Sequence, residues 1–124
     1  MGEIKKLTNA YDSKNKVLTG AITIESVEQN DSKEIYSLIE KSLQEFSDYN
    51  DYILDASKVN NIKIESFGYL MKALGIVKRT AGYMVLVIKE DILQKFMLTN
   101  PEMFDYYAVF FSTSEALEYI LSKR

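Results

Sequence analysis

The sequence contains no cysteine and no histidine among its 124 residues. Without cysteine there is no disulfide, no zinc–thiolate site and no cysteine nucleophile. Without histidine the chain lacks the commonest general base and the commonest ligand of transition metals. The usual catalytic triads are therefore unavailable, and any chemistry would depend on carboxylates and lysines. This composition favours a protein that is not an enzyme and that holds no metal and no cofactor.

Strong charge of one sign and long apolar runs are also missing. The formal net charge is −3, and no basic stripe of the kind that binds nucleic acid is present. The apolar runs are far shorter than the ~20 residues that a membrane helix needs. Residues 1–6 lack the apolar core of a signal peptide. We therefore expect a cytoplasmic protein with no membrane span and no nucleic-acid partner.

Linker-like and repetitive segments are absent as well. Pro101 is the only proline, and the five glycines are too dispersed to form a phosphate-binding loop. The apolar fraction of 47% and the charged fraction of 27% are those of an ordinary globular chain. The length suits one domain of usual size. We expect a single domain over residues 1–124.

Turn residues divide the first part of the chain into a predicted hairpin and a helix. Residues 4–11 and 17–24 flank the turn cluster Asp12–Asn15 and are typical of an antiparallel hairpin. Asp31, with Glu34 three residues later, has the spacing of a capping box and predicts the start of a helix. One face of this helix is apolar and consists of Ile35, Leu38, Ile39, Leu43 and Phe46.

The remainder of the chain alternates between apolar runs and segments of helical periodicity. The runs Tyr52–Ala56, Tyr83–Ile88 and Tyr106–Phe111 predict neighbouring parallel strands that are buried on both faces. A second helix before Gly82 and a third before Pro101 are predicted from apolar spacing and from these stop signals. The second helix is expected to bury Phe67, Leu70, Met71, Leu74 and Val77, and the third to present Ile92, Leu93, Phe96 and Met97.

A last helix follows the capping box formed by Ser112 and Glu115. It is expected to bury Ala116, Leu117, Ile120 and Leu121. The order is then β-β-α-β-α-β-α-β-α, which predicts an α/β domain with a mixed, mostly parallel central sheet and about four helices. The residues expected to be largely buried in its core are Leu54, Leu70, Leu74, Val85, Leu86, Val87 and Val109.

Two places along this order are candidates for a functional site. Asp55 ends a buried strand, where open parallel sheets bind ligands, although its residue type is equally suited to a turn. The segment Ile62–Phe67 crowds apolar residues beside a helix N-terminus, whose unpaired N–H groups favour an acidic residue or a phosphate. The same residue types also fit core plugs at Ile62 and Ile64 and capping by Glu65 and Ser66. The pattern alone leaves both interpretations open.

Four stretches, taken in order, match one family pattern. Residues 52–62 have its apolar strand, its Asp-x-Ser step and a loop that ends in a hydrophobic residue, and Gly68 occupies the place of its second signature glycine. Residues 81–87 match its glycine step into the next strand, and residues 98–100 with 112–117 match its closing segments. In this order and spacing the sequence resembles the STAS domain of bacterial anti-sigma factor antagonists. The match covers about 70 residues well.

The resemblance fails at the family's phosphorylation loop, which reads Asp-Ser-(Ser/Thr/Ala)-Gly-x-Gly and is phosphorylated on its first serine. A gapless alignment, which keeps Gly82 in register, places Lys63 on the aspartate and Ile64 on the acceptor serine, and Ile64 cannot carry a phosphate. An insertion of two residues would instead align Glu65–Gly68 with Asp-Ser-Ser-Gly and make Ser66 the acceptor. Ser66 is therefore the one possible phosphosite.

The resemblance implies a non-catalytic interaction module of bacterial signalling that regulates transcription. Its partner would be an anti-sigma factor or a kinase-like regulator. One alternative is a STAS-like sensor that binds a nucleotide or a lipid at the sheet edge. Another is a small enzyme that uses Asp55 and Glu65. The sequence leaves the oligomeric state open. The residues expected to bind the partner are Ile62, Lys63, Ile64, Glu65, Ser66 and Phe67.

Overall fold

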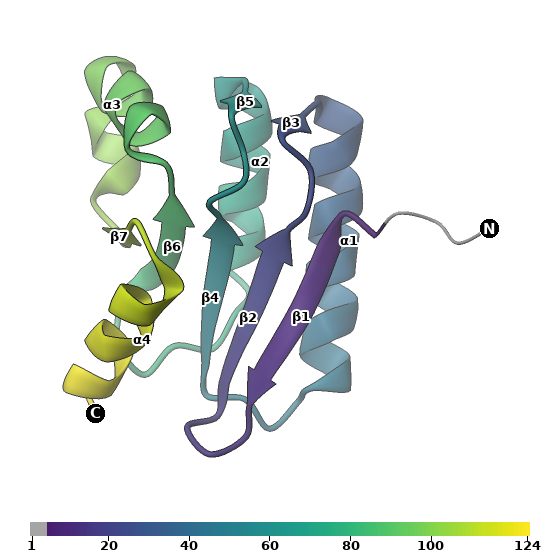
Figure 1. Ribbon diagram of the computed structural model, residues 1–124, viewed down its shortest axis with the longest axis vertical. Helices are drawn as coiled ribbons and strands as arrows, with labels where there is room; N and C mark the ends of the chain where they lie inside the picture. The colour runs from purple at the N-terminus through teal and green to yellow at the C-terminus, as the bar shows by residue number, and fades with distance from the viewer. Residues whose placement is uncertain (1–4) are drawn as a thin grey trace.

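A five-stranded sheet forms the centre of the computed structural model, which describes residues 5–124 (Figure 1). Its strand order is β1-β2-β4-β6-β7. The β1–β2 pair is the predicted antiparallel hairpin, and the other neighbouring pairs are parallel. The predicted mixed, mostly parallel sheet is confirmed. The strands are β1 (Leu7–Asp12), β2 (Val17–Ile22), β4 (Asp51–Ala56), β6 (Met84–Ile88) and β7 (Tyr107–Phe110).

Four α-helices cover the two faces of this sheet unequally. Figure 1 shows α1 and α2 behind the sheet and α4 in front of it. Buried residues of α3 share one core cluster with those of α1 and α2, so these three helices cover the same face. Among the helices of residues 5–124, α4 alone covers the second face. The helices are α1 (Gln29–Glu45), α2 (Ile64–Leu74), α3 (Glu90–Thr99) and α4 (Thr113–Ser122).

The alternation of side chains along each strand supplies both clusters. Leu54 and Leu86 point to the face of α1 and α2, whereas Ile53, Val85 and Val87 point to the face of α4. All five side chains are at most 2% exposed. Strands that are covered on both faces need apolar residues at every position, which is why these runs are continuous in the sequence.

The prediction that Val109 is largely buried was wrong. The other predicted core residues are buried, but Val109 is only half-buried because β7 is an edge strand with β6 as its one neighbour in the described part of the chain. The predicted strand over residues 106–111 is shorter at both ends. Tyr106 is 70% exposed and Phe111 is 49% exposed. An edge strand and a central strand of four to six apolar residues have the same sequence pattern.

Three further predictions required correction, two of them at helix ends and one in the burial of α4. The predicted capping box of Asp31 with Glu34 was wrong. The helix α1 begins at Gln29, and the Asp31 carboxylate instead accepts a hydrogen bond from the N–H of the N-cap residue Glu28 at 2.8 Å. The second helix ends at Leu74, so Gly82, with a φ of 89°, turns the loop before β6 rather than ending the helix. Leu121 is 39% exposed on the outer side of α4.

The cap of the last helix was predicted correctly. The Ser112 Oγ accepts a hydrogen bond from the Glu115 N–H at 3.3 Å. Three short elements escaped prediction because they are too short to show a period: β3 (Ser26–Val27), β5 (Asn61–Ile62) and the 3₁₀-helix η1 (Pro101–Phe104). Among the described residues no helix is long and apolar enough to cross a membrane.

Candidate partner-binding surface

The segment that leads into α2 is fixed at the carboxyl end of the sheet. Strand β5 pairs in parallel with β3, which precedes α1. The backbone N–H groups of Asn60 and Asn61 also donate to the Glu25 carbonyl, at 2.7 and 3.2 Å. The Lys89 ammonium donates to the Asn60 side-chain carbonyl and ties the loop to the start of α3. The loop is therefore held on two sides before α2 begins.

The six residues predicted to bind a partner divide into a buried and an accessible set. Ile62 and Ser66 are each 3% exposed, and Phe67 is 2% exposed. Lys63 and Glu65 are exposed, and Ile64 between them is half-buried. Only Lys63, Ile64 and Glu65 thus offer substantial surface to another protein. We call these three residues the Lys63–Glu65 strip.

The buried residues of the set anchor α2 to the rest of the domain. The Phe67 ring lies 4.7 Å from the ring of Phe96 in α3 and 6.0 Å from that of Phe104, measured between centroids. Ile62 and Phe67 belong to the larger core cluster. Ile62 and Phe67 are therefore core residues, and the Lys63–Glu65 strip packs over them.

The strip forms the first turn of α2. Lys63 is the N-cap residue, and its carbonyl accepts the Phe67 N–H at 3.0 Å. No side chain caps this helix within the described chain, since a lysine side chain has no acceptor. The first N–H groups of the helix lack an intrahelical acceptor and carry partial positive charge. Glu65 places one carboxylate in this turn, which stabilises the helix by roughly 0.3–1 kcal/mol.

A shallow groove runs beside the strip towards α3. Lys63, Ile64 and Glu65 form one wall of it. The other wall comes from α3 and the residue that follows it. Those residues are Lys95, Phe96, Thr99 and Asn100.

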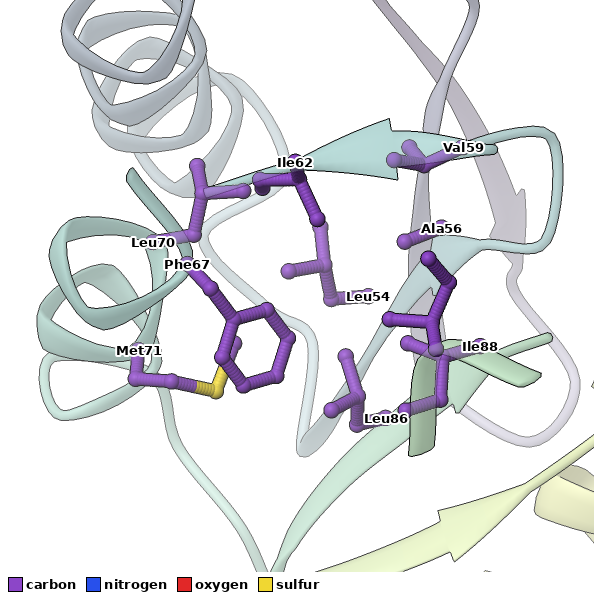
Figure 2. A pocket seen from close by; sticks show the side chains of 10 residues that line it. Leu54, Ala56, Val59, Ile62, Phe67, Leu70, Met71, Leu86 and Ile88 are labelled. Carbon is purple, nitrogen blue, oxygen red and sulfur yellow. The ribbon is translucent and has the colours of Figure 1, made fainter. Parts of the chain in front are cut away.

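The space behind the strip is closed to small ligands. Figure 2 shows side chains from β4, β6 and α2 converging on a cavity at this edge of the sheet. Its volume is about 10 Å³, and no polar surface lines it. That volume is about what one water molecule needs. A nucleotide or an acyl chain would enter only if the core reorganised. The lining residues are Leu54, Ala56, Val59, Ile62, Phe67, Leu70, Met71, Leu86, Ile88 and Ile92.

The two carboxylates considered for catalysis do not come together. Asp55 lies on the same side of β4 as Ile53, the side that α4 covers, and Glu65 belongs to α2 on the opposite face. The Asp55 carboxylate accepts the Ser57 N–H at 3.0 Å, so it shapes the turn after β4. No group of three or more acidic residues that could hold a metal ion occurs in residues 5–124.

Comparison with known proteins gives one informative result. No family model matches the sequence, and no curated protein matches it. A solved structure of the Bacillus cell fate determinant SpoIIAA in the phosphorylated form superposes with a TM-score of 0.52. The superposition covers 90% of this chain and 96% of the SpoIIAA chain, and the two sequences are 7% identical.

The chain has the STAS fold. The resemblance stated from the sequence is thus confirmed for the fold. At 7% identity the likeness to SpoIIAA does not extend to individual residues. The contact of Lys89 with Asn60 had no signal in the sequence, because 29 residues separate the two.

Proposed function

We propose that this chain is a non-catalytic interaction module of bacterial signalling, similar to an anti-sigma factor antagonist. It binds an anti-sigma factor or a kinase-like regulator in the cytoplasm. The contact surface is the Lys63–Glu65 strip with the groove towards α3. One observation carries the proposal: an apolar side chain, Ile64, stands partly exposed between two opposite charges on an immobilised first turn.

The rigidity of the strip favours recognition of another protein. Backbone pairing of β5 with β3 holds one end of the segment, and the Phe67 ring holds the other. A surface that is ordered before binding loses little conformational entropy when a partner docks. The closed cavity beneath it supports surface recognition over the sensor alternative.

Binding at this surface is constitutive, or is controlled through the partner. Ile64 has no hydroxyl group to phosphorylate, and the Ser66 residue is 3% exposed. A kinase would reach Ser66 only after the first turn of α2 had opened locally. SpoIIAA itself was solved in the phosphorylated form. Ser66 stays a possible phosphosite only under the shifted alignment, and the gapless alignment predicts that it is unmodified.

The test is to isolate the protein with its bound partner from native cells and to map both the interface and the phosphosites. Hydrogen–deuterium exchange should slow in the first turn of α2 when the partner is bound. Mass spectrometry should find Ser66 unmodified in that complex. Unchanged exchange in residues 63–67, with protection elsewhere, would place the interface on another surface. Stoichiometric phosphate on Ser66 would show that the shifted alignment and its switch are correct.

A further inference from the structure

Strand β7 leaves one long side of its backbone without a partner strand. Within residues 5–124 it pairs with β6 alone, and Figure 1 shows it at the outer edge of the sheet between α3 and α4. The surrounding segment, residues 106–111, reads Tyr-Tyr-Ala-Val-Phe-Phe. It has no charge, no proline and no glycine, which is the composition of segments that pair with other strands.

The register with β6 defines which backbone groups point outward. The Met84 N–H donates to the Tyr106 carbonyl at 3.2 Å. Along a parallel ladder, alternate residues of one strand bond to the neighbour and the residues between them point away. Ala108 and Phe110 therefore bond to β6. The N–H and carbonyl groups of Tyr107 and Val109 face the free side.

β7 is short, but it has no lysine, no proline and no bulge to block pairing with another strand. Lysines, prolines and bulges on an edge strand are the usual protection. At the other edge of the sheet, β1 follows Lys5 and Lys6 and ends in Asp12. At β7 the strand is flanked by exposed aromatic residues instead, with Tyr106 70% and Phe111 49% exposed. We therefore expect another strand to pair with this edge.

We propose that β7 pairs with β7 of a second copy of this chain, antiparallel and about a two-fold axis at Val109. The two sheets then form one continuous sheet with β1 at each end. This proposal concerns the sheet edge and does not depend on the partner-binding strip of α2.

The register follows from geometry. A two-fold axis perpendicular to the sheet keeps each face on the same side, so opposite residues must point to the same face. An axis at Val109 places Val109 opposite its own copy, and their outward N–H and carbonyl groups exchange hydrogen bonds. Ala108 then lies opposite Phe110, a small side chain against a large one. Tyr107 lies opposite Phe111, an aromatic pair of the kind that stabilises antiparallel strands.

A second copy fits this edge better than a foreign strand. The segment carries no charge that would select a complementary sequence, and it is complementary in size to itself. Two-fold pairing also leaves neither β7 edge unpaired, so the assembly is closed at two copies. A closed dimer removes the exposed edge that would otherwise promote open-ended association.

The cysteine-free sequence allows a direct test on the full chain. A single Val109→Cys variant should be cross-linked to a covalent dimer by a short bifunctional thiol reagent, because Cα atoms of a hydrogen-bonded antiparallel pair lie about 5.5 Å apart. Thr8→Cys, exposed on β1, is the matched control and should stay monomeric on the gel. Cross-linking of Thr8→Cys with none at Val109→Cys would overturn the proposal.

Sedimentation velocity over a broad concentration range completes the test. The unmodified chain should form a dimer, and Val109→Pro should shift it to monomer while its circular dichroism spectrum stays unchanged. Proline is tolerated at this position because the Val109 N–H does not bond to β6. A chain that is monomeric at every concentration, or that forms larger open-ended species, contradicts the proposal. So does a Val109→Pro variant that folds and remains dimeric.

Discussion

The guanidinium of Arg124 lies 2.8 Å from the carboxylate of Asp51, measured from Nη2 to Oδ2, although 73 residues separate them. Asp51 is the first residue of β4 and is 1% exposed. The Thr80 N–H and the Thr80 hydroxyl each donate to this carboxylate at 2.5 Å, and the Ala81 N–H donates at 3.3 Å. A buried charge is thus fully paired at the end of the sheet opposite the partner-binding strip.

Removal of the two partners should have unequal effects. Asp51→Ala leaves the donors of Thr80, Ala81 and Arg124 unpaired and should cost roughly 3–5 kcal/mol of unfolding free energy, as for other broken buried pairs. Arg124→Ala leaves the carboxylate with its Thr80 and Ala81 donors and should cost about 1 kcal/mol. Urea denaturation of both variants measures the difference. An Arg124→Ala loss as large as that of Asp51→Ala would show that the ion pair, not the backbone donors, stabilises this corner.

Gly20 makes room for the ring of Tyr52 on the neighbouring strand. A Cβ at position 20 would overlap with the Tyr52 Oη and lie 2.9 Å from the ring carbon Cζ. Gly20→Ala should therefore cost roughly 1–3 kcal/mol through overpacking. The Tyr52 hydroxyl is buried and has no hydrogen-bond partner among the described residues. Tyr52→Phe should then be nearly neutral or stabilising, because it removes an unpaired polar group.

The double variant measures the contact itself. Gly20→Ala combined with Tyr52→Phe should be less destabilised than the sum of the two single changes. Thermal and urea unfolding of the three variants give the coupling energy. Strict additivity would mean that the hydroxyl and the new Cβ do not meet.

Leu86 occupies the centre of the larger core cluster and is 0% exposed. Leu86→Ala should lower the free energy of unfolding by roughly 2–5 kcal/mol, the range for loss of a large core side chain. Leu98→Ala in α3 is the matched control, because Leu98 is 87% exposed and should change little. Equal denaturation midpoints for the two variants would place Leu86 outside the cooperative core.

Acid should weaken the link between the chain before β1 and the start of α1. The Lys6 ammonium lies 2.7 Å from the Asp31 carboxylate, and this contact, with the Glu28 N–H, lowers the pKa of Asp31 below its ordinary value. A carboxyl with a lowered pKa in the folded state stabilises the fold above its unfolded pKa. That stabilisation is lost as the pH falls through the folded-state pKa.

Asp31→Asn should therefore lower the free energy of unfolding at neutral pH. Below about pH 4, near the ordinary pKa of aspartate, the free energy of unfolding of the variant should decrease less steeply with falling pH than that of the unmodified chain. The loss should be under about 1 kcal/mol, as for other solvent-accessible pairs. Stability curves of both proteins from pH 2 to 7 (roughly the span over which carboxylates titrate) should converge at the acid end. Parallel curves would show that Asp31 titrates alike in the folded and unfolded chains.

The sequence predicted the parts of this fold that rest on local periodicity. The apolar runs of β4 and β6 and the helical spacing from Phe67 to Leu74 are visible because burial on a regular element imposes a period. The Ser112 cap is visible because its residue types are specific. The edge position of Val109 is not visible, since the strand order depends on which segments pair.

The candidate site was predictable as a segment but not residue by residue. Apolar spacing in α2 already placed Phe67 on the core face, yet Phe67 also belonged to the set expected to bind a partner. The burial of Ser66 depends on where α2 begins, which the loop sequence does not specify. The Asp51 cluster had no signal, because Asp51 ends a polar turn in the sequence and its charged partner is remote.

The affinity of the partner for an Ile64→Asp variant tests the central claim most directly. Ile76→Asp is the matched control: Ile76 is 46% exposed in the loop after α2 and lies outside the strip. With the partner isolated from native cells, calorimetric titration should show that Ile64→Asp lowers the affinity roughly 10-fold or more, as for an interface residue whose replacement costs about 1.4 kcal/mol or more. Ile76→Asp should bind like the unmodified chain, and both variants should retain cooperative unfolding. Unchanged affinity of folded Ile64→Asp would contradict the assignment of this surface.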